Sequence, residues 1–381
     1  MGSDPDTNQS ERVAAWLSAT VAGAAPPWPD GAGDHFGDAV CEAAIEHGVC
    51  ALLARRHARE GSPAWPTGLR RRLRAHLAAA AAAEVLRRLE VERVVSAFAR
   101  GGVPSVLLKG TPLAYTHYPQ PWLRPRADTD VLIIPERRSA SAEAMTQAGY
   151  HRGIGFGGEL VTHQDEWERV DEQGLRHVFD IHTRIANPHL FARLLEFPEL
   201  VRRSVPVPAL GPGARALGVV DALLLAGIHR AAHHHGANRL IWLYDISLLL
   251  GTMNANDLRS VVSLATSKGI RAVTGDAITE ACVRFSVQVP SELTALEVLP
   301  SGRPEATASF LEPGRAKVDI LLADLRALPG WGQRARLVVE HLFPPADFMR
   351  KAYPRLHPVI LPLAYTHRIL TGVAKWFRST T

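Results

Sequence analysis

Cysteine is scarce in this sequence, with three residues among 381. Cys41, Cys50 and Cys282 form neither a CxxC pair nor a spacing typical of a metal site. This scarcity excludes a disulfide scaffold and is typical of a reducing cytoplasm. The N-terminus is polar and acidic and has no signal-peptide pattern. We therefore expect a cytoplasmic protein.

Long apolar runs are missing as well. The longest candidates, residues 222–228 and 357–365, are short or interrupted by proline and histidine. A membrane-spanning helix needs about 20 apolar residues in succession. The sequence therefore predicts no membrane partner.

Lysine is the third scarce residue, because only five of the 43 Lys and Arg residues are lysines. The formal net charge is +5, but the basic residues are scattered along the chain. Proteins that bind nucleic acids usually concentrate such charge in a patch. The pattern therefore does not indicate a nucleic-acid surface, and it makes an isolated lysine such as Lys109 more informative.

Both ends of the chain have helical patterns. Apolar residues at helical spacing predict helices over residues 11–24, 39–60 and 69–100. Proline-rich segments at residues 25–31 and 63–66 separate these helices. From residue 214 the periodicity returns and predicts a second, mainly helical region.

The middle of the chain alternates between short apolar runs and helical segments. The runs predict strands at residues 105–108, 129–134, 151–154, 159–163 and 175–185, with helices at 111–118, 139–148 and 190–203. Glycines at residues 153–158 predict a hairpin turn, because no helix opens after them. We expect an α+β fold with a small mixed sheet. Its parts are a helical region (1–100), a core (101–205) and a C-terminal helical domain (206–381).

Three carboxylates belong to these predicted strands. Asp128 and Asp130 lead into one apolar run, and Asp180 lies inside a later one. Side chains alternate along a strand, so Asp128 and Asp130 point to the same face. Paired carboxylates repel each other and favour a cation with oxygen ligands, such as Mg²⁺. The alternative is structural: Asp128 caps a turn and Asp130 makes a buried salt bridge with Arg124 or Arg126.

Lys109 and Gly110 lie between the first predicted strand and the helix that follows it. Glycine allows a phosphate to approach the backbone, a helix N-terminus offers free N–H groups, and lysine adds a point charge. These features predict a phosphate-binding turn. The alternative is a surface lysine ahead of a helix that opens with Gly110, Thr111 and Pro112.

A histidine-rich segment is the other candidate site. His229 and His233 lie four residues apart on one predicted helical face. Such a pair can bind zinc, but no HExxH motif accompanies it. We favour a helix that packs towards the catalytic cleft. Whether it lines the site is left open, and Trp242 is expected in the core.

Three segments, LLKG, LRPRADTDVLI and VFDIH, resemble a bacterial family of uncharacterised nucleotidyltransferases within the DNA-polymerase-β-like superfamily. The superfamily has a glycine-containing turn after its first strand, an acidic-x-acidic pair on the next and a third acidic residue on a later strand. Gly110, Asp128 with Asp130, and Asp180 match this order. The usual Gly-Ser turn is replaced here by Lys109 and Gly110. The resemblance extends over roughly residues 35–255.

This resemblance implies a polymerase-β-like core and an enzyme that depends on Mg²⁺, or Mn²⁺, and uses an NTP, expected to be ATP. Asp128 and Asp130 would hold the metal ions, and Asp180 would complete the metal site and act as a base. The residues expected to contact the nucleotide are Lys109, Gly110, Thr111, Arg124 and His182. Arg124 and His182 have the alternative role of orienting the aspartates.

The expected reaction is transfer of a nucleoside monophosphate to an acceptor that the sequence does not identify. A small molecule, a peptide, a protein and a tRNA remain open. One alternative is kinase-type phosphate transfer to a peptide or small molecule by the same site. Another is a nucleotide-binding partner protein without catalytic activity.

Overall fold

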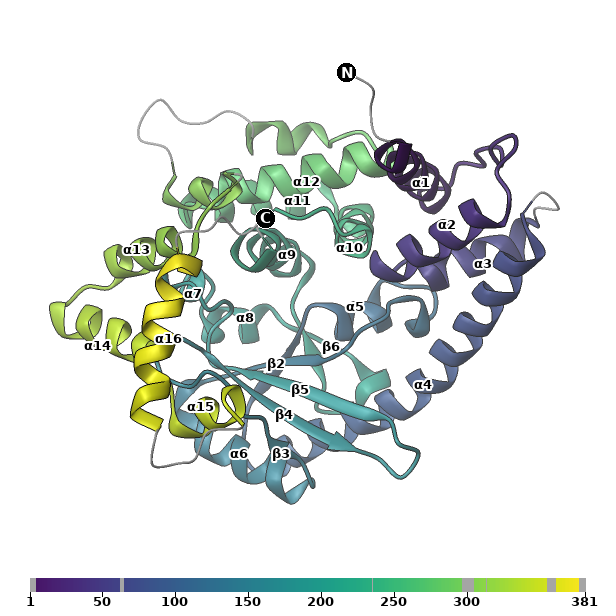
Figure 1. The fold of residues 1–381 in the computed structure, drawn as a ribbon. Coiled ribbons are helices and arrows are strands. Elements are labelled where there is room, and N and C mark those ends of the chain that lie inside the picture. Colours follow the sequence, from purple (N-terminus) through teal and green to yellow (C-terminus); the bar gives the residue numbers. More distant parts are fainter. Residues whose placement is uncertain are drawn as a thin grey trace.

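A seven-stranded β-sheet forms the centre of the molecule, in the order β3-β4-β5-β2-β1-β7-β6 (Figure 1). The structure, a computed structural model, describes residues 5–61, 65–234, 236–296, 305–312, 314–354 and 361–376. The strands are β1 (Ser105–Leu108), β2 (Thr129–Ile133), β3 (His151–Arg152), β4 (Gln164–Val170), β5 (Arg176–His182), β6 (Val205–Pro206) and β7 (Arg215–Ala216). Strand β2 pairs antiparallel with β1 and parallel with β5, so the sheet is mixed, as predicted.

Four helices precede the sheet: α1 (Pro5–Ala22), α2 (Asp34–Glu46), α3 (Cys50–Glu60) and α4 (Thr67–Arg100). The single helix predicted over residues 39–60 is wrong, because the chain turns between α2 and α3. Gly48 has a φ of +72°, which glycine adopts at little cost. The N–H groups of Gly48 and Val49 donate to carbonyls in the last turn of α2 and close it.

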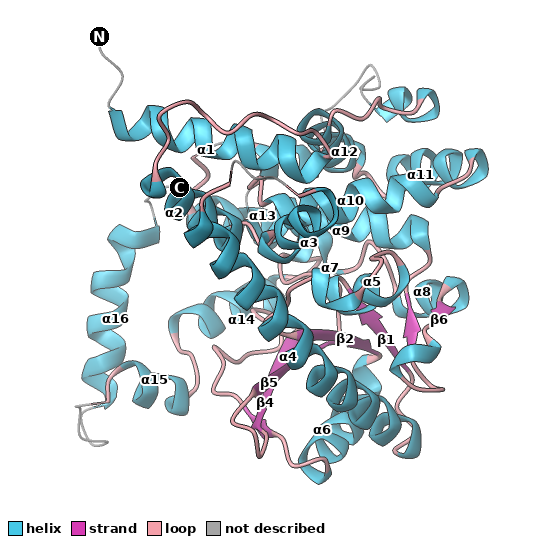
Figure 2. Cartoon of the chain, turned by 90° about the vertical axis from the view of Figure 1, so that its right-hand side faces the viewer, coloured by secondary structure: helices cyan, strands magenta, loops and turns pink. Residues whose placement is uncertain are grey.

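Helices cover both faces of the sheet (Figure 2). On one face, Val106, Leu108 and Leu132 pack in a core with α8 (Phe197–Arg203) and α9 (Val219–His234). On the other face, Leu107 and Val131 pack in a core with α4 and α6 (Arg138–Gln147). This alternation places every second side chain of β2 beneath α9. The position of Asp130 follows directly, since it lies two residues before Leu132.

The helices after the sheet are α10 (Leu240–Thr252), α11 (Ala255–Ser267), α12 (Arg271–Phe285), α13 (Lys317–Ala327), α14 (Trp331–Leu342), α15 (Ala346–Ala352) and α16 (Leu361–Trp376). Helix α10 belongs to two cores, because Leu243 and Ile246 pack with α9 whereas Leu240 and Ile241 pack with α1–α3. It therefore joins the N-terminal helices to the helices above the sheet. Among the described residues, no helix has the length and apolar character needed to cross a membrane.

Strand β4 differs from the prediction. A strand was expected over residues 159–163, but the chain there is irregular, and the strand is Gln164–Val170. Its sequence, QDEWERV, has only one buried side chain, Trp167, so its apolar pattern is weak. Main-chain pairing with β5 along seven positions holds it in the sheet. Residues 160 and 161 instead donate their N–H groups to Glu340 of α14.

Two further segments differ from the prediction. The helix predicted over residues 190–203 is divided into α7 (His189–Ala192) and α8. The segment expected to be a linker, residues 206–212, begins at the end of β6 and leads to β7, which pairs in parallel with β1. The sheet therefore continues as far as residue 216.

Candidate active site

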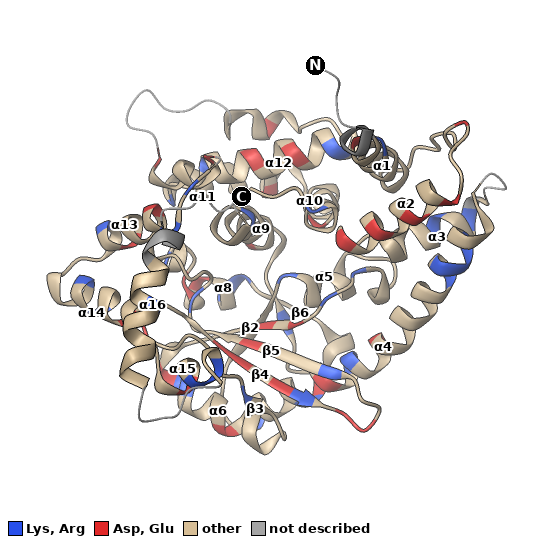
Figure 3. Cartoon of the chain, in the orientation of Figure 1, with Lys and Arg blue, Asp and Glu red and all other residues tan. Residues whose placement is uncertain are grey.

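The pairing of β2 with β5 brings two of the predicted carboxylates together. Asp130 lies opposite Asp180 in the parallel register, and Leu132 lies opposite His182. Asp130, Asp180 and His182 therefore share the face of the sheet that lies beneath α9. Acidic positions on β2, β5 and β4 lie side by side in Figure 3, and Glu166 of β4 is the neighbour of Asp180.

Asp130 is buried between two nitrogen donors. Lys109 Nζ lies 2.6 Å from Asp130 Oδ1, and His182 Nε2 lies 2.8 Å from the same oxygen. Burial alone would raise the pKa of Asp130, but the charge of Lys109 and the hydrogen bond from His182 outweigh it and hold the pKa well below its usual range. Asp130 is therefore ionised at neutral pH. The alternative pairing of Asp130 with Arg124 or Arg126 is wrong, because Lys109 forms the salt bridge.

Asp180 has the opposite character. Its Oδ2 accepts a hydrogen bond from Gln164 Nε2 at 3.2 Å, while its Oδ1 is buried without a hydrogen-bond partner. Burial raises the pKa of Asp180 to about 7, with the charges of Asp130 and Asp128 acting in the same direction. A buried carboxylate oxygen without a donor is costly unless a cation or a proton satisfies it.

One ligand atom from each of Asp130, Asp180 and His182 lies within 4.8 Å of the other two. Two carboxylates and an imidazole in such a group can hold a divalent cation, and the orphaned Asp180 Oδ1 fits this use. Asp128 is not part of this group. It is exposed to the neighbouring cavity, where lost hydration and then the charge of Asp130 raise its pKa.

The turn after β1 has an unusual backbone. Lys109 has φ 57° and ψ −133°, a conformation that favours glycine. It precedes α5 (Gly110–Thr116), and Gly110 is buried. A Cβ atom on Gly110 would lie 2.9 Å from the Arg124 guanidinium carbon, so only glycine leaves room for that group. This turn directs Lys109 towards Asp130 and places Arg124 over Gly110.

Arg124 forms its ion pair with Asp245 and not with the expected Asp128 or Asp130. Its Nε and Nη2 donate to Asp245 of α10 at 2.7–3.0 Å, and Tyr118 donates to Asp245 at 2.7 Å. The guanidinium therefore links the core to α10 and does not pair with Asp128 or Asp130. The Thr111 hydroxyl is buried and donates to Thr129 at 3.2 Å, away from the cavity lining.

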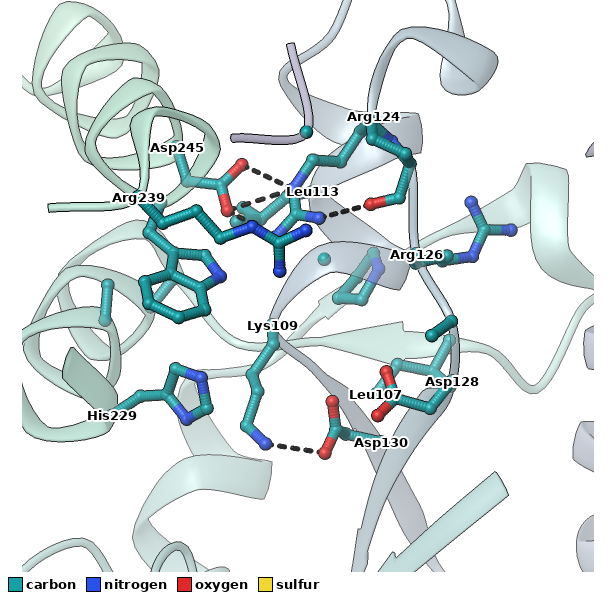
Figure 4. Close-up of a pocket in the computed structure, with 18 of the residues that line it drawn as sticks. Leu107, Lys109, Leu113, Arg124, Arg126, Asp128, Asp130, His229, Arg239 and Asp245 are labelled. Atoms are coloured by element: carbon teal, nitrogen blue, oxygen red, sulfur yellow. Dashed lines mark hydrogen bonds and ion pairs between the residues drawn. The ribbon is translucent and has the colours of Figure 1, made fainter. Parts of the chain in front are cut away.

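A cavity of about 590 Å³ opens beside these residues (Figure 4). The carboxylates of Asp128 and Asp130 point into it, together with Lys109. Its walls come from three parts of the chain: the N-terminal helices, the turn and strands of the sheet, and helices α9 and α10. Lining residues that the sequence did not assign to a site are His76, Arg87, Arg239, Trp242 and Asp245.

The histidine-rich helix α9 lines this cavity. The sequence alone did not decide whether it would. His229 and His234 belong to the lining, whereas His233 does not. The Nε2 atoms of His229 and His234 lie 3.2 Å apart, and the His234 ring lies tilted against the Trp242 ring, with the ring centres 4.0 Å apart. Burial, followed by the charge of Lys109, lowers the pKa of His229 well below its usual value. His229 is therefore a neutral part of the cavity wall beside Lys109. Trp242 lines the same wall and also packs against the core of the N-terminal helices, as expected.

One family model, described as "Uncharacterised nucleotidyltransferase", matches residues 37–281. The match covers well over half of the chain and includes all seven strands, the cavity lining and helices α9–α11, and it ends within α12. Helices α13–α16 lie outside it. No curated protein shows significant similarity to the chain.

Proposed function

Since the chain belongs to the uncharacterised nucleotidyltransferase family, we propose that it transfers a nucleoside monophosphate from an NTP to an acceptor group. The observation that carries this proposal is the group of Asp130, Asp180 and His182 beside Lys109, next to a cavity. Family membership supports transfer of a phosphorus-containing group in general. The geometry supports a cation and a phosphate chain bound close together.

The donor set suits Mg²⁺ or Mn²⁺. Asp130 and Asp180 would be its carboxylate ligands, His182 would be the third, and Asp128 would face it from the cavity. A cation bound there would neutralise the negative charge of the phosphates during transfer. Asp180 Oδ1 supports this assignment, because it is buried and lacks a donor.

The side chains around this group have separable roles in the proposed reaction. Lys109 would contribute positive charge to the phosphates, and Gly110 lets the chain turn closely beneath them. Asp180 would complete the cation site and accept the proton of the acceptor hydroxyl. The hydroxyl oxygen then bonds to the α-phosphorus of the NTP, and pyrophosphate leaves.

The acceptor is proposed to be a small molecule or the flexible end of a peptide. The cavity has a volume typical of small-ligand sites, and its walls come from both helical regions and the sheet. A tRNA or a folded protein would have to insert a narrow end between α4, α9 and α10. The scattered basic charge, visible in Figure 3, does not favour RNA.

Labelled nucleotides test this function. The full chain is incubated with each of the four NTPs, labelled at either the α- or the γ-phosphate, together with Mg²⁺ and candidate acceptors. Transfer of the α-label supports the proposal, transfer of the γ-label alone indicates a kinase, and no transfer with any acceptor contradicts catalysis. Asp180→Ala should abolish labelling. Glu172→Ala, in the exposed turn between β4 and β5, is the matched control and should retain it.

A further inference from the structure

Arg239 directs a positive charge into the cavity without a carboxylate partner. It immediately precedes α10, and its guanidinium points into the cavity in Figure 4. Its Nε donates to the backbone carbonyl of Glu46 at 2.9 Å. Within the described residues, Arg239 forms no ion pair, and its hydrogen bond to Glu46 uses only Nε.

A second guanidinium lies close by. Arg124 is buried against Asp245, and burial followed by the charge of Arg124 lowers the pKa of Arg239. The Asp245 carboxylate pairs with Arg124, and the charge of Glu46 acts on Arg239 without forming an ion pair. Two neighbouring positive charges in a cavity are unfavourable unless an anion compensates them. The α10 end of the cavity therefore favours an anionic ligand.

The N-terminal helices hold Arg239 in this position. Besides the bond to the Glu46 carbonyl, Ile241 N–H donates to the His47 carbonyl at 3.1 Å. A Cβ atom on Gly48 would lie 3.1 Å from Ile241 and 3.6 Å from Arg239 Nη2, so the chain passes α10 closely at a glycine. On its other side, the Arg239 guanidinium lies 5.4 Å from the centre of the Trp242 ring. These contacts make Arg239 a preorganised donor, unlike a mobile surface arginine.

We propose that Arg239 binds the terminal phosphates of the NTP, while Arg124, paired with Asp245, lies behind it and adds to the positive charge at that end of the cavity. Both groups lie across the cavity from Asp130 in Figure 4, with Lys109 between them and the carboxylate. A phosphate chain that follows this line meets the cation group at one end and the Arg239 guanidinium at the other, whereas the Arg124 fork is occupied by Asp245. The planar fork of arginine matches two phosphate oxygens at once. This inference rests on the proposed function, which supplies the NTP.

The N-terminal helices thereby gain a role in substrate binding. Residues 46–48 are distant from the catalytic carboxylates in sequence, yet they aim Arg239. The Arg239 guanidinium could instead receive an anionic group of the acceptor. In that case the site would show no preference for a chain of phosphates over a single phosphate.

Sodium tripolyphosphate is the probe, because it carries the phosphate chain without a base. Its binding to the full protein is measured calorimetrically with Mg²⁺, and inorganic phosphate is measured alongside it. Arg239→Ala should weaken tripolyphosphate binding by about tenfold to a hundredfold. Arg239→Lys should lose less, about threefold, because it keeps the charge but not the fork. Arg259→Ala, an exposed arginine on α11, is the matched control and should bind as the wild type does.

Thermal unfolding shows whether each variant is folded, and Arg239→Lys carries the test should Arg239→Ala fail to fold. The proposal is overturned by equal tripolyphosphate binding of the folded Arg239 variant and the wild type. It is also overturned by wild-type protein that binds inorganic phosphate as tightly as tripolyphosphate, which indicates a site for a single anionic group. Either result leaves the proposed function standing where the wild type still transfers an α-labelled nucleotide. Absence of that transfer contradicts the proposed function itself.

Discussion

Lys109 forms an ion pair with Asp130 while its own backbone has a conformation that favours glycine. Its ammonium lies 2.6 Å from Asp130 Oδ1, while its φ is 57°. Among the described residues, Ser286 is the other non-glycine residue with a positive φ. The strain at Lys109 accompanies a side chain that reaches the carboxylate group, as strained residues at functional sites often do.

This relationship predicts an unusual order of stability for two variants. Both Lys109→Gly and Lys109→Ala lose the ion pair, but only glycine relieves the backbone. The strain costs about 1–3 kcal/mol, and the extra freedom of glycine in the unfolded chain costs about 0.4–1 kcal/mol. In urea titrations, the free energy of unfolding of Lys109→Gly should therefore be about 1 kcal/mol higher than that of Lys109→Ala. An alanine variant at least as stable as the glycine variant would show that the turn is not strained.

A second prediction concerns the cation. Asp180→Asn and His182→Ala should each weaken Mn²⁺ binding by at least about tenfold, because each removes one of three converging ligands. Asp128→Asn should have a smaller effect, since Asp128 lies outside that group. Titration of Mn²⁺ followed by electron paramagnetic resonance measures the bound fraction. The reverse order, with Asp128→Asn the most damaging, would move the cation towards the cavity and away from His182.

The buried pair of Arg124 and Asp245 gives a third prediction. Asp245→Asn leaves the Arg124 guanidinium, whose side chain is 9 % exposed, without a counter-charge. Breaking a buried pair in this way typically costs about 3–5 kcal/mol. The double variant Arg124→Met/Asp245→Leu should recover much of that loss, because no charge is left buried. Urea unfolding of the wild type, Asp245→Asn and the double variant measures both changes. A single variant as stable as the wild type would mean that water already screens the pair.

The positions of the central strands could be predicted from the sequence, because each strand is a short apolar run with polar or turn residues at its ends. Residues 105–108 form the predicted strand, and the predicted strands that carry Asp130 and Asp180 agree with β2 and β5 to within a few residues. Alternation along β2 then placed Asp130 on one face. The sequence did not predict that Lys109 is the salt-bridge partner of Asp130. Lys109 reaches Asp130 only through a backbone conformation that is unusual for lysine.

Other parts of the site depend on contacts between distant segments. Strand β4 is mostly charged, so its membership of the sheet depends on main-chain pairing with β5. Arg239 lines the cavity because α10 packs against the turn at residues 46–48, nearly two hundred residues earlier. Thr111 was expected to face the nucleotide, but a seven-residue helix turns its hydroxyl towards Thr129. Helical periodicity gives no information on any of these three arrangements.

A buried carboxylate far from the cavity makes the stability of the fold depend on pH. Asp324 of α13 is 7 % exposed, and its Oδ1 accepts the His189 N–H at 2.6 Å. Burial raises the pKa of Asp324 to about 7, against a partial opposing effect of the hydrogen bonds from the backbone. The folded protein therefore holds a proton on Asp324 at pH values where the unfolded chain has lost it. Its contribution to stability is greatest near pH 4 and is lost progressively as the pH rises to about 7.

Asp324→Asn should remove this dependence, because asparagine keeps the carbonyl acceptor for His189 and does not ionise. The free energy of unfolding of the variant, relative to the wild type, should rise between pH 4 and pH 7 by about 1–3 kcal/mol and then stay level. Urea titrations at several pH values measure this difference. Asp347→Asn, at an exposed carboxylate on α15, is the matched control and should give a difference that does not change with pH. A flat difference for Asp324→Asn as well would mean that Asp324 is already ionised in the fold at low pH, so that α13 packs over a charge and not over a neutral acid.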